Sequence, residues 1–253
     1  ITPLKDRIGA EIQTHYPTEV SIGMEITRQE AWIKRDCIEI EVPDFIAEII
    51  ERTAFLGRKD KRIDQRSGVS QRMPITALES VISSAERRAL ILKEKQVVPR
   101  IADIYGALPA ITGKIELEYE GELHGSEQIA RELISKATSE VFQDRAGGTD
   151  VEDIVEYFEL GGAIQVGTDS SAKACVQGFE TIPGLFQLIA LVGLAPESCS
   201  DGWRAGACEL VLEALVAERR ISRSTGGSYA KAPYESSSGE GHKGLDPFGG
   251  VTL

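Results

Sequence analysis

The run Gly68-Val69-Ser70-Gln71-Arg72 carries a cation at the point where a strongly amphipathic helix is predicted to begin. With Ser70 as the N-cap, Arg72 lies in the first helical turn, where free backbone N–H groups and the positive end of the dipole favour an anion. A cation in that turn is unfavourable by roughly a few tenths of a kcal/mol. A nearby phosphate would offset this cost. Ser70 and Arg72 are therefore candidate ligands of an anion.

A purely structural explanation of Arg72 competes with this one. The charged loop of residues 57–68 precedes the helix, and an exposed arginine could form a salt bridge to Asp60 or Asp64 within it. On spacing alone, the salt bridge is the favoured interpretation. The dipeptide Asp6-Arg7 is equally uninformative by itself, because it also fits a surface ion pair.

Other kinds of catalytic or metal site are not indicated. The histidines have no partner at ligand spacing, and the cysteines form no C-x-x-C pair. These residues are His15, His124 and His242, and Cys37, Cys175, Cys199 and Cys208. No G-x-S-x-G, H-E-x-x-H or complete phosphate loop occurs. The sequence therefore predicts reduced, mostly buried thiols and neither a zinc site nor a self-contained hydrolase.

Charge and hydropathy exclude two classes of partner. The 253 residues include 40 acidic and 28 basic side chains, which gives a formal net charge of −12. That field repels nucleic acid and anionic membranes. No apolar run reaches the about 18 residues of a membrane span, residues 182–195 are typical of a buried core helix, and no signal peptide is found. We therefore expect a cytoplasmic protein and, because the sequence starts at Ile1, a part of a longer chain.

The N-terminal part is predicted to hold a strand among helices. Residues 1–9 favour a short helix, and the alternation in residues 10–17 predicts a short strand that ends at a proline. The capping-box pattern Thr27-x-x-Glu30 predicts a helix over about 28–36. Pro43 then opens a further helix that is expected to end at Gly57.

The middle of the chain has two strong helical stripes. Apolar residues at three- and four-residue steps follow Ser70, and a second set follows Ser126, a plausible N-cap. The two stripes are Ile75, Leu78, Ile82, Ala85 and Ala89, and Ile129, Leu133, Ile134, Ala137 and Val141. Pro99 is predicted to start a helix between them. Residues 114–123 fit either an extended segment or a helix.

Gly147-Gly148 is the candidate domain boundary. The pattern Thr149-x-x-Glu152 again has capping-box spacing and predicts a helix immediately after it. Further helices are expected near 171–180, 182–194 and 201–222. The remaining residues are rich in glycine, serine and proline without periodicity, which predicts a disordered tail.

The order of these features resembles the AAA+ ATPases of the magnesium-chelatase and MoxR-type group. Gly68-x-Ser70-x-Arg72 matches the G-x-S-x-R element that opens the lid helix of that family and supplies its sensor-2 arginine. The run Leu4-Lys5-Asp6-Arg7-Ile8 resembles the family's L-x-D-R-F element, with Lys5 and Ile8 departing from it. The resemblance covers about residues 1–95.

This resemblance implies a mainly α fold. It comprises the helical lid bundle of an AAA+ ATPase, a short N-terminal strand from the α/β core and a helical C-terminal domain. Residues 1–36 would be the end of the core, 37–146 the lid and its extension, 147–222 the C-terminal helical domain and 223–253 a disordered tail.

The resemblance also implies an activity. A homo-oligomeric ring would couple ATP hydrolysis to the remodelling of a client protein or to metal chelation. Arg7 would be the catalytic arginine finger that reaches the neighbouring subunit's nucleotide, and Arg72 with Ser70 would bind the γ-phosphate side of ATP. The phosphate loop and the Mg²⁺ ligands are expected upstream of Ile1, so this segment alone is expected neither to bind ATP well nor to hydrolyse it.

Two other functions also fit parts of the sequence. The helices of residues 99–222 and the acidic surface also suit a protein-interaction module without nucleotide chemistry. An enhancer-binding transcription activator shares the AAA+ lid, but it is disfavoured because no basic helix-turn-helix pattern closes the chain.

Overall fold

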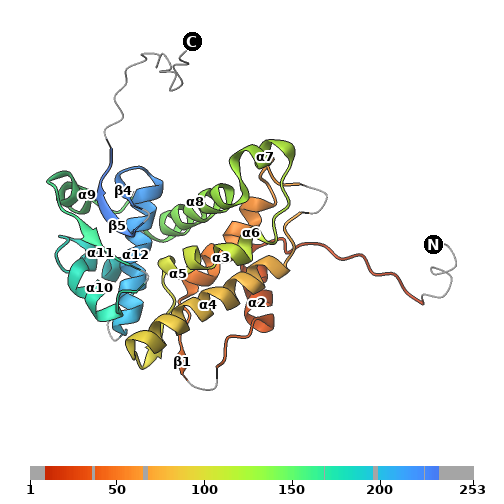
Figure 1. Ribbon diagram of the computed structural model, residues 1–253, viewed down its shortest axis with the longest axis horizontal. Helices are drawn as coiled ribbons and strands as arrows, with labels where there is room; N and C mark the ends of the chain where they lie inside the picture. Colours follow the sequence, from red (N-terminus) through yellow and green to blue (C-terminus); the bar gives the residue numbers. More distant parts are fainter. Residues whose placement is uncertain are drawn as a thin grey trace, which may run out of the picture.

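The computed structural model describes residues 9–35, 38–64, 68–167, 169–195, 199–224 and 226–233. Across these ranges the protein is mainly helical with a few short strands (Figure 1). The helices are α2 (Val20–Glu30), α3 (Asp44–Gly57), α4 (Arg72–Leu92), α5 (Ile101–Gly106), α6 (Leu108–Thr112), α7 (Tyr119–His124), α8 (Ser126–Ala146), α9 (Glu152–Glu159), α10 (Ala172–Phe179), α11 (Leu185–Leu191) and α12 (Asp201–Ala217). The strands are β1 (Glu39–Ile40), β2 (Gln96–Val97), β3 (Ile164–Gln165), β4 (Ile221–Arg223) and β5 (Ser228–Lys231).

Helix α8 lies between the helices that precede it in the chain and those that follow it. It packs against α3 on the N-terminal side and against α12 on the C-terminal side. The predicted apolar stripe of α8 is confirmed, because all five of its residues are buried. Burial of one apolar stripe against a neighbour is what stabilises a surface helix of this kind.

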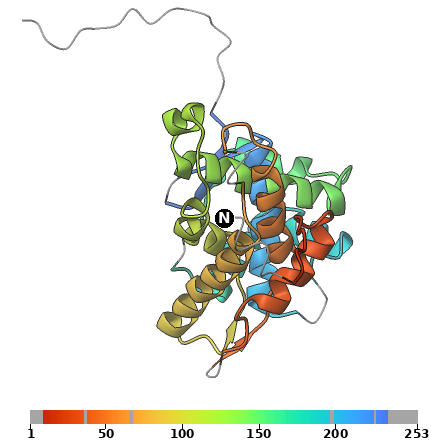
Figure 2. The ribbon, with the colours of Figure 1, turned by 90° about the vertical axis from the view of Figure 1, so that its right-hand side faces the viewer.

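Helix α4 lies across α2, α3, α5 and α6 and is the long gold helix of Figure 2. Four of the five predicted core positions of α4 are buried, while Ile75 at the first turn is half-buried. Both long amphipathic helices were therefore predicted correctly from periodicity.

Two small sheets complete the fold. β1 and β2 pair in parallel, with Glu39 opposite Gln96. β3, β5 and β4 form an antiparallel sheet in that order, with Ile164 opposite Tyr229. The second sheet brings the end of the described chain back onto the helices that follow Gly148.

A single hydrophobic cluster includes residues on both sides of Gly147 and Gly148. α12 is buried along most of its length, as expected of a helix surrounded by other elements. Its buried residues include two carboxylates, Glu209 and Glu213. The core of α12 must therefore supply hydrogen-bond partners as well as apolar contacts.

Several N-terminal predictions were wrong. No strand is present within residues 10–17, and the helix predicted over 28–36 is instead α2, which ends at Glu30. Thr27 is not an N-cap, because its hydroxyl lies inside the last turn of α2 and donates to Glu51 at 3.0 Å. The helix of residues 1–9 lies almost wholly outside the described residues.

Differences also appear further along the chain. Thr149 does not cap α9; the carboxylate of Asp150 accepts the backbone N–H of Glu152 at 2.9 Å. Residues 114–123, for which the sequence fits either an extended segment or a helix, hold an isolated bridge at Leu117 and most of α7. Strand β5 extends to Lys231, beyond the predicted start of the tail at residue 223.

Candidate functional site

Arg72 is exposed and is the first residue of α4. The residue before the helix is Gln71, and no side chain caps the N-terminus; the Ser70 carbonyl, rather than its hydroxyl, accepts the Met73 N–H at 3.0 Å. The predicted capping role of the Ser70 hydroxyl was therefore wrong. Pro74 lies in the first turn, where the missing N–H removes no helical hydrogen bond.

Gly68 is required by geometry at the start of this segment. Its φ of +61° lies in the left-handed region, and a Cβ at this position would come within 2.8 Å of the Tyr16 hydroxyl. Glycine adopts such a φ without the steric cost that other residues meet. The glycine of the G-x-S-x-R run is thus explained by the turn that precedes α4.

Gln71 ties the start of α4 to a buried carboxylate. Its side-chain amide donates to the two oxygens of Glu51 at 3.0 and 3.2 Å and lies 3.3 Å from the Thr27 hydroxyl. Glu51 is fully buried on α3. Burial raises the pKa of the Glu51 carboxyl above its ordinary value, although the bonds from Gln71 and Thr27 and the charge of Arg58 act in the opposite direction.

Arg58 fixes the same segment from the end of α3. Its Nε donates to the Val69 carbonyl at 2.8 Å, and one terminal nitrogen donates to Oε1 of Gln71 at 3.0 Å. The guanidinium also stacks over the Tyr16 ring, 4.5 Å from its centroid. Residues 69–71 are therefore held by side chains from two other elements, and Arg72 projects from an anchored segment.

Arg72 itself has no hydrogen bond or ion pair from its side chain to any described residue. The predicted alternative, a salt bridge from Arg72 to Asp60 or Asp64, is not found among these residues. Asp60 instead binds Arg62 at 2.8 Å, and this bond holds the pKa of Asp60 below its ordinary value. The other candidate arginine, Arg7, lies outside the described residues.

A second polar cluster is buried at the other end of α4. Arg88 donates to Oδ2 of Asp103 at 2.8 Å and forms an ion pair with Glu94 at 3.3 Å. The other carboxylate oxygen of Glu94 accepts the Ala172 N–H, at the start of α10, at 2.7 Å. α4 is therefore linked by directional bonds to α5 and α10.

Arg100 and Glu209 continue this cluster into α12. Arg100 is fully buried, and its Nε lies 3.4 Å from a carboxylate oxygen of Glu209. Another nitrogen of Arg100 lies 2.6 Å from the sulfur of Cys175, and Glu209 also accepts the Ala102 N–H at 3.0 Å. Periodicity alone cannot reveal this pair. One signal was available, namely that Glu209 and Glu213 stand within the otherwise apolar run of residues 205–217.

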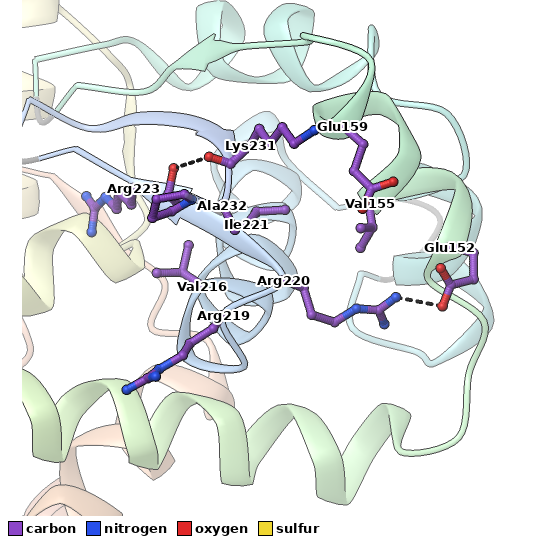
Figure 3. A pocket seen from close by; sticks show the side chains of 12 residues that line it. Glu152, Val155, Glu159, Val216, Arg219, Arg220, Ile221, Arg223, Lys231 and Ala232 are labelled. Atoms are coloured by element: carbon purple, nitrogen blue, oxygen red, sulfur yellow. Dashed lines mark hydrogen bonds and ion pairs between the residues drawn. The ribbon is translucent and has the colours of Figure 1, made fainter. Parts of the chain in front are cut away.

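A surface hollow of about 870 Å³ lies between α9, the segment that joins α12 to β4, and the end of β5 (Figure 3). Arg220 binds Glu152 of α9 at 2.6 Å. The preceding residue, Arg219, points away from that pair toward α8. The Ser222 hydroxyl donates to the Lys231 carbonyl at 2.8 Å and joins the two strands of the hairpin.

The described residues contain no group of three or more His, Cys, Asp or Glu side chains that could hold a metal ion. None of the helices in the described ranges has both the length and the apolar character that a membrane span requires. Comparison of the chain with protein-family models, with curated proteins and with solved structures found no match.

Proposed function

We propose that this chain is the lid-bearing part of an AAA+ ATPase similar to the magnesium-chelatase group, and that Arg72 contacts the γ-phosphate of ATP. Ser70 would lie beside the same phosphate. The observation that carries the proposal is an exposed arginine at the N-terminus of α4 with no partner among the described residues, on a segment anchored by Gln71 and Arg58.

The chemistry of this position suits a phosphate. The guanidinium is permanently charged and presents a planar fork of donors that matches phosphate oxygens. The positive end of the α4 dipole adds to the same field, although the Met73 N–H is already bonded and Pro74 has none. ATP, when bound, supplies a γ-phosphoryl group whose oxygens gather negative charge during transfer. Arg72 would stabilise that charge and would withdraw if the lid moved away.

The anchoring of residues 69–71 supports a catalytic role for Arg72, because a group that stabilises charge is most effective when its position is fixed beforehand. The bonds from Gln71 to Glu51 and from Arg58 to Val69 fix the backbone immediately before Arg72. The nucleotide, its Mg²⁺ and the neighbouring subunit's Arg7 would complete the site. The phosphate loop and the Mg²⁺ ligands would come from residues outside the printed sequence, as the resemblance implies.

Substitution in the full-length protein tests this proposal. Arg72→Ala is expected to lower the rate of ATP hydrolysis by about 100-fold or more, the effect of removing one preorganised charge-stabilising donor. Arg72→Lys would recover only part of the rate, since an ammonium does not reproduce the fork. Arg87→Ala is the matched control, because Arg87 is exposed on the same helix. Normal hydrolysis by Arg72→Ala would refute the proposal.

The ring is tested separately through Arg7. Arg7→Ala subunits mixed with wild-type subunits are expected to lower hydrolysis more steeply than dilution predicts, because each variant finger would disable a neighbour's site. A linear fall with the fraction of variant subunits would argue against a shared site between subunits.

A helical interaction module without nucleotide chemistry is the second candidate. It is favoured by two large apolar side chains on α7, Tyr119 and Leu123, which are 77% and 74% exposed. These two side chains are four residues apart, so they lie on the same face of α7 and would both be covered by a partner that docks there. If ATP neither binds to the full-length protein nor raises its melting temperature, this function would replace the first.

A further inference from the structure

A second cleft, of about 860 Å³, lies between α5, α8, the end of α12 and β4. One wall is a polar stripe of α8 that includes Arg131, Ser135 and Ser139. The opposite wall carries Arg219 and Arg223. None of the residues around Arg72 lines this cleft, so it is separate from the site proposed above.

Positive charge predominates in the lining. The cations are Arg131, Lys136, Arg219 and Arg223, and the anions are Glu132 and Glu213. The surrounding chain has a net charge of −12, so a cationic lining runs against its overall composition.

The two carboxylates of the lining are already engaged. Glu132 accepts a bond from Arg62 at 2.7 Å. Glu213 is buried, accepts from the Tyr105 hydroxyl at 3.3 Å and forms an ion pair with Arg223 at 2.9 Å. Lys136 is exposed and has no hydrogen bond or ion pair to another described residue, although its charge acts on Asp60.

Two of the three arginines of the cleft lie over an aromatic ring, and each also has a carboxylate partner, Glu127 for Arg131 at 2.8 Å and Glu213 for Arg223. The guanidinium carbons of Arg223 and Arg131 lie 5.0 and 5.8 Å from the centroid of Tyr105. The Nε of Arg223 is buried and has no hydrogen-bond partner among the described residues. A buried donor left unbonded is costly, and a ligand or an ordered water is the usual way such a donor is satisfied.

Hydroxyl donors complete the set. Ser135 and Ser139 are one turn apart on α8 and half-buried, and neither hydroxyl bonds a described residue. Arginine forks together with serine hydroxyls are suited to phosphate, because its several oxygens accept bonds from different directions. The volume of the cleft also falls within the range of about 300–1,000 Å³ for small-molecule sites.

We propose that this cleft binds a small phosphorylated molecule through Arg131, Lys136, Arg219 and Arg223. Nothing in this proposal depends on ATP binding near Arg72. A nucleotide and a phosphorylated sugar present the same phosphate, so the two sources must be separated by experiment.

Arg219 has a φ of +60°, in the left-handed region, after the end of α12. Arg219→Gly would delete the cation at a position where glycine suits the backbone. Because Arg219 also makes an interaction within the chain, the melting temperature of the variant is measured beside that of wild type. Lys93 has φ of +57° after the end of α4 and does not line the cleft. Lys93→Gly is therefore a control matched in both charge and conformation.

Inorganic pyrophosphate is the first probe, titrated by calorimetry into the 253-residue chain at low salt. Binding is expected to weaken about tenfold or more in Arg219→Gly and further in the double variant with Lys136→Ala, but not in Lys93→Gly. Binding should also weaken as the salt concentration rises. Competition by AMP and by ribose 5-phosphate would then show whether a nucleotide or a sugar phosphate fits better.

The opposite results are equally specific. Absence of pyrophosphate binding at millimolar concentration, or equal affinity in Arg219→Gly and Lys93→Gly, would overturn the proposal. Loss of binding in Arg72→Ala with retention in Arg219→Gly would assign the anion to α4 and would also overturn it. If Arg72→Ala lowers ATP hydrolysis in the full-length protein but leaves pyrophosphate binding unchanged, the cleft is separate from the Arg72 site, as proposed.

Discussion

The side-chain amide of Gln71 donates to both carboxylate oxygens of Glu51, at 3.0 and 3.2 Å, across the junction between α4 and α3. The bond explains why a glutamine stands between Ser70 and Arg72. It also makes the position of Arg72 depend on a buried acid that belongs to a different helix.

Gln71→Ala is expected to destabilise the protein by about 1–3 kcal/mol, because it leaves the buried Glu51 with fewer donors. Urea unfolding would measure the change. Gln96→Ala is a suitable control, since Gln96 bonds only the half-buried Glu41 on the β1–β2 edge. If both substitutions lower the free energy of unfolding by the same amount, the bond to the buried Glu51 contributes no more than the bond to the half-buried Glu41.

Glu51 should also make stability depend on pH. Because burial raises the pKa of Glu51 in the folded state, the folded protein binds this proton more tightly than the unfolded chain does. Its contribution is then fully present below the unfolded pKa of about 4.3 and is lost as pH rises through the higher folded value. The difference in unfolding free energy between wild type and Glu51→Gln should therefore shift in favour of the variant as pH rises from 4 to 7. A difference that is independent of pH would contradict this.

Gly68→Ala should be costly for two separate reasons. The left-handed φ costs roughly 1–2 kcal/mol for a residue with a Cβ, and the new atom also meets the Tyr16 hydroxyl. Adding Tyr16→Phe would remove only the second part, so the double variant should recover part of the melting temperature. Gly9→Ala is the control, because a Cβ there meets nothing within 4 Å.

Arg100→Met is expected to destabilise by about 3–5 kcal/mol, since Glu209 would remain buried without its cation. Arg100→Met combined with Glu209→Leu should recover part of that loss, because the buried carboxylate is removed with its cation, while the Ala102 N–H loses its acceptor. A double-mutant cycle in denaturant measures the coupling. Additive losses would show that the two side chains are energetically independent.

The two long amphipathic helices were predictable because each has a complete apolar stripe. The stripes of α4 and α8 depend only on residue type and period, and both were found where expected. The resemblance to an AAA+ lid, by contrast, remains a prediction, because a mainly helical fold is compatible with many families.

Thr27 shows why the N-terminal elements could not be placed. Its spacing to Glu30 satisfied the capping pattern, but its hydroxyl is used by Glu51, 24 residues away along the chain. A local pattern cannot reveal a partner on another helix. The same limit hid Arg58 and Gln71, whose roles near Arg72 exist only because α2, α3 and α4 pack together.

The position of Glu51 in the sequence indicates that it has a buried partner. It occupies the buried side of α3 together with Ala47 and Ala54, where an apolar residue is expected. A charged residue on such a face indicates a buried partner, although not which one. Glu209 gave the same kind of signal in α12.

The bonds at the two ends of α4 have a mechanical consequence. Arg72 and Arg88 are separated by about 24 Å along the axis at 1.5 Å per residue, and polar bonds fix the helix near both positions. A tilt of about 10° around the Arg88 end would move the Arg72 end by roughly 4 Å, more than the length of a hydrogen bond. α4 therefore connects the Arg88 cluster rigidly to the Arg72 end, and a tilt of this size would have to break the bonds that Gln71 and Arg58 make beside Arg72.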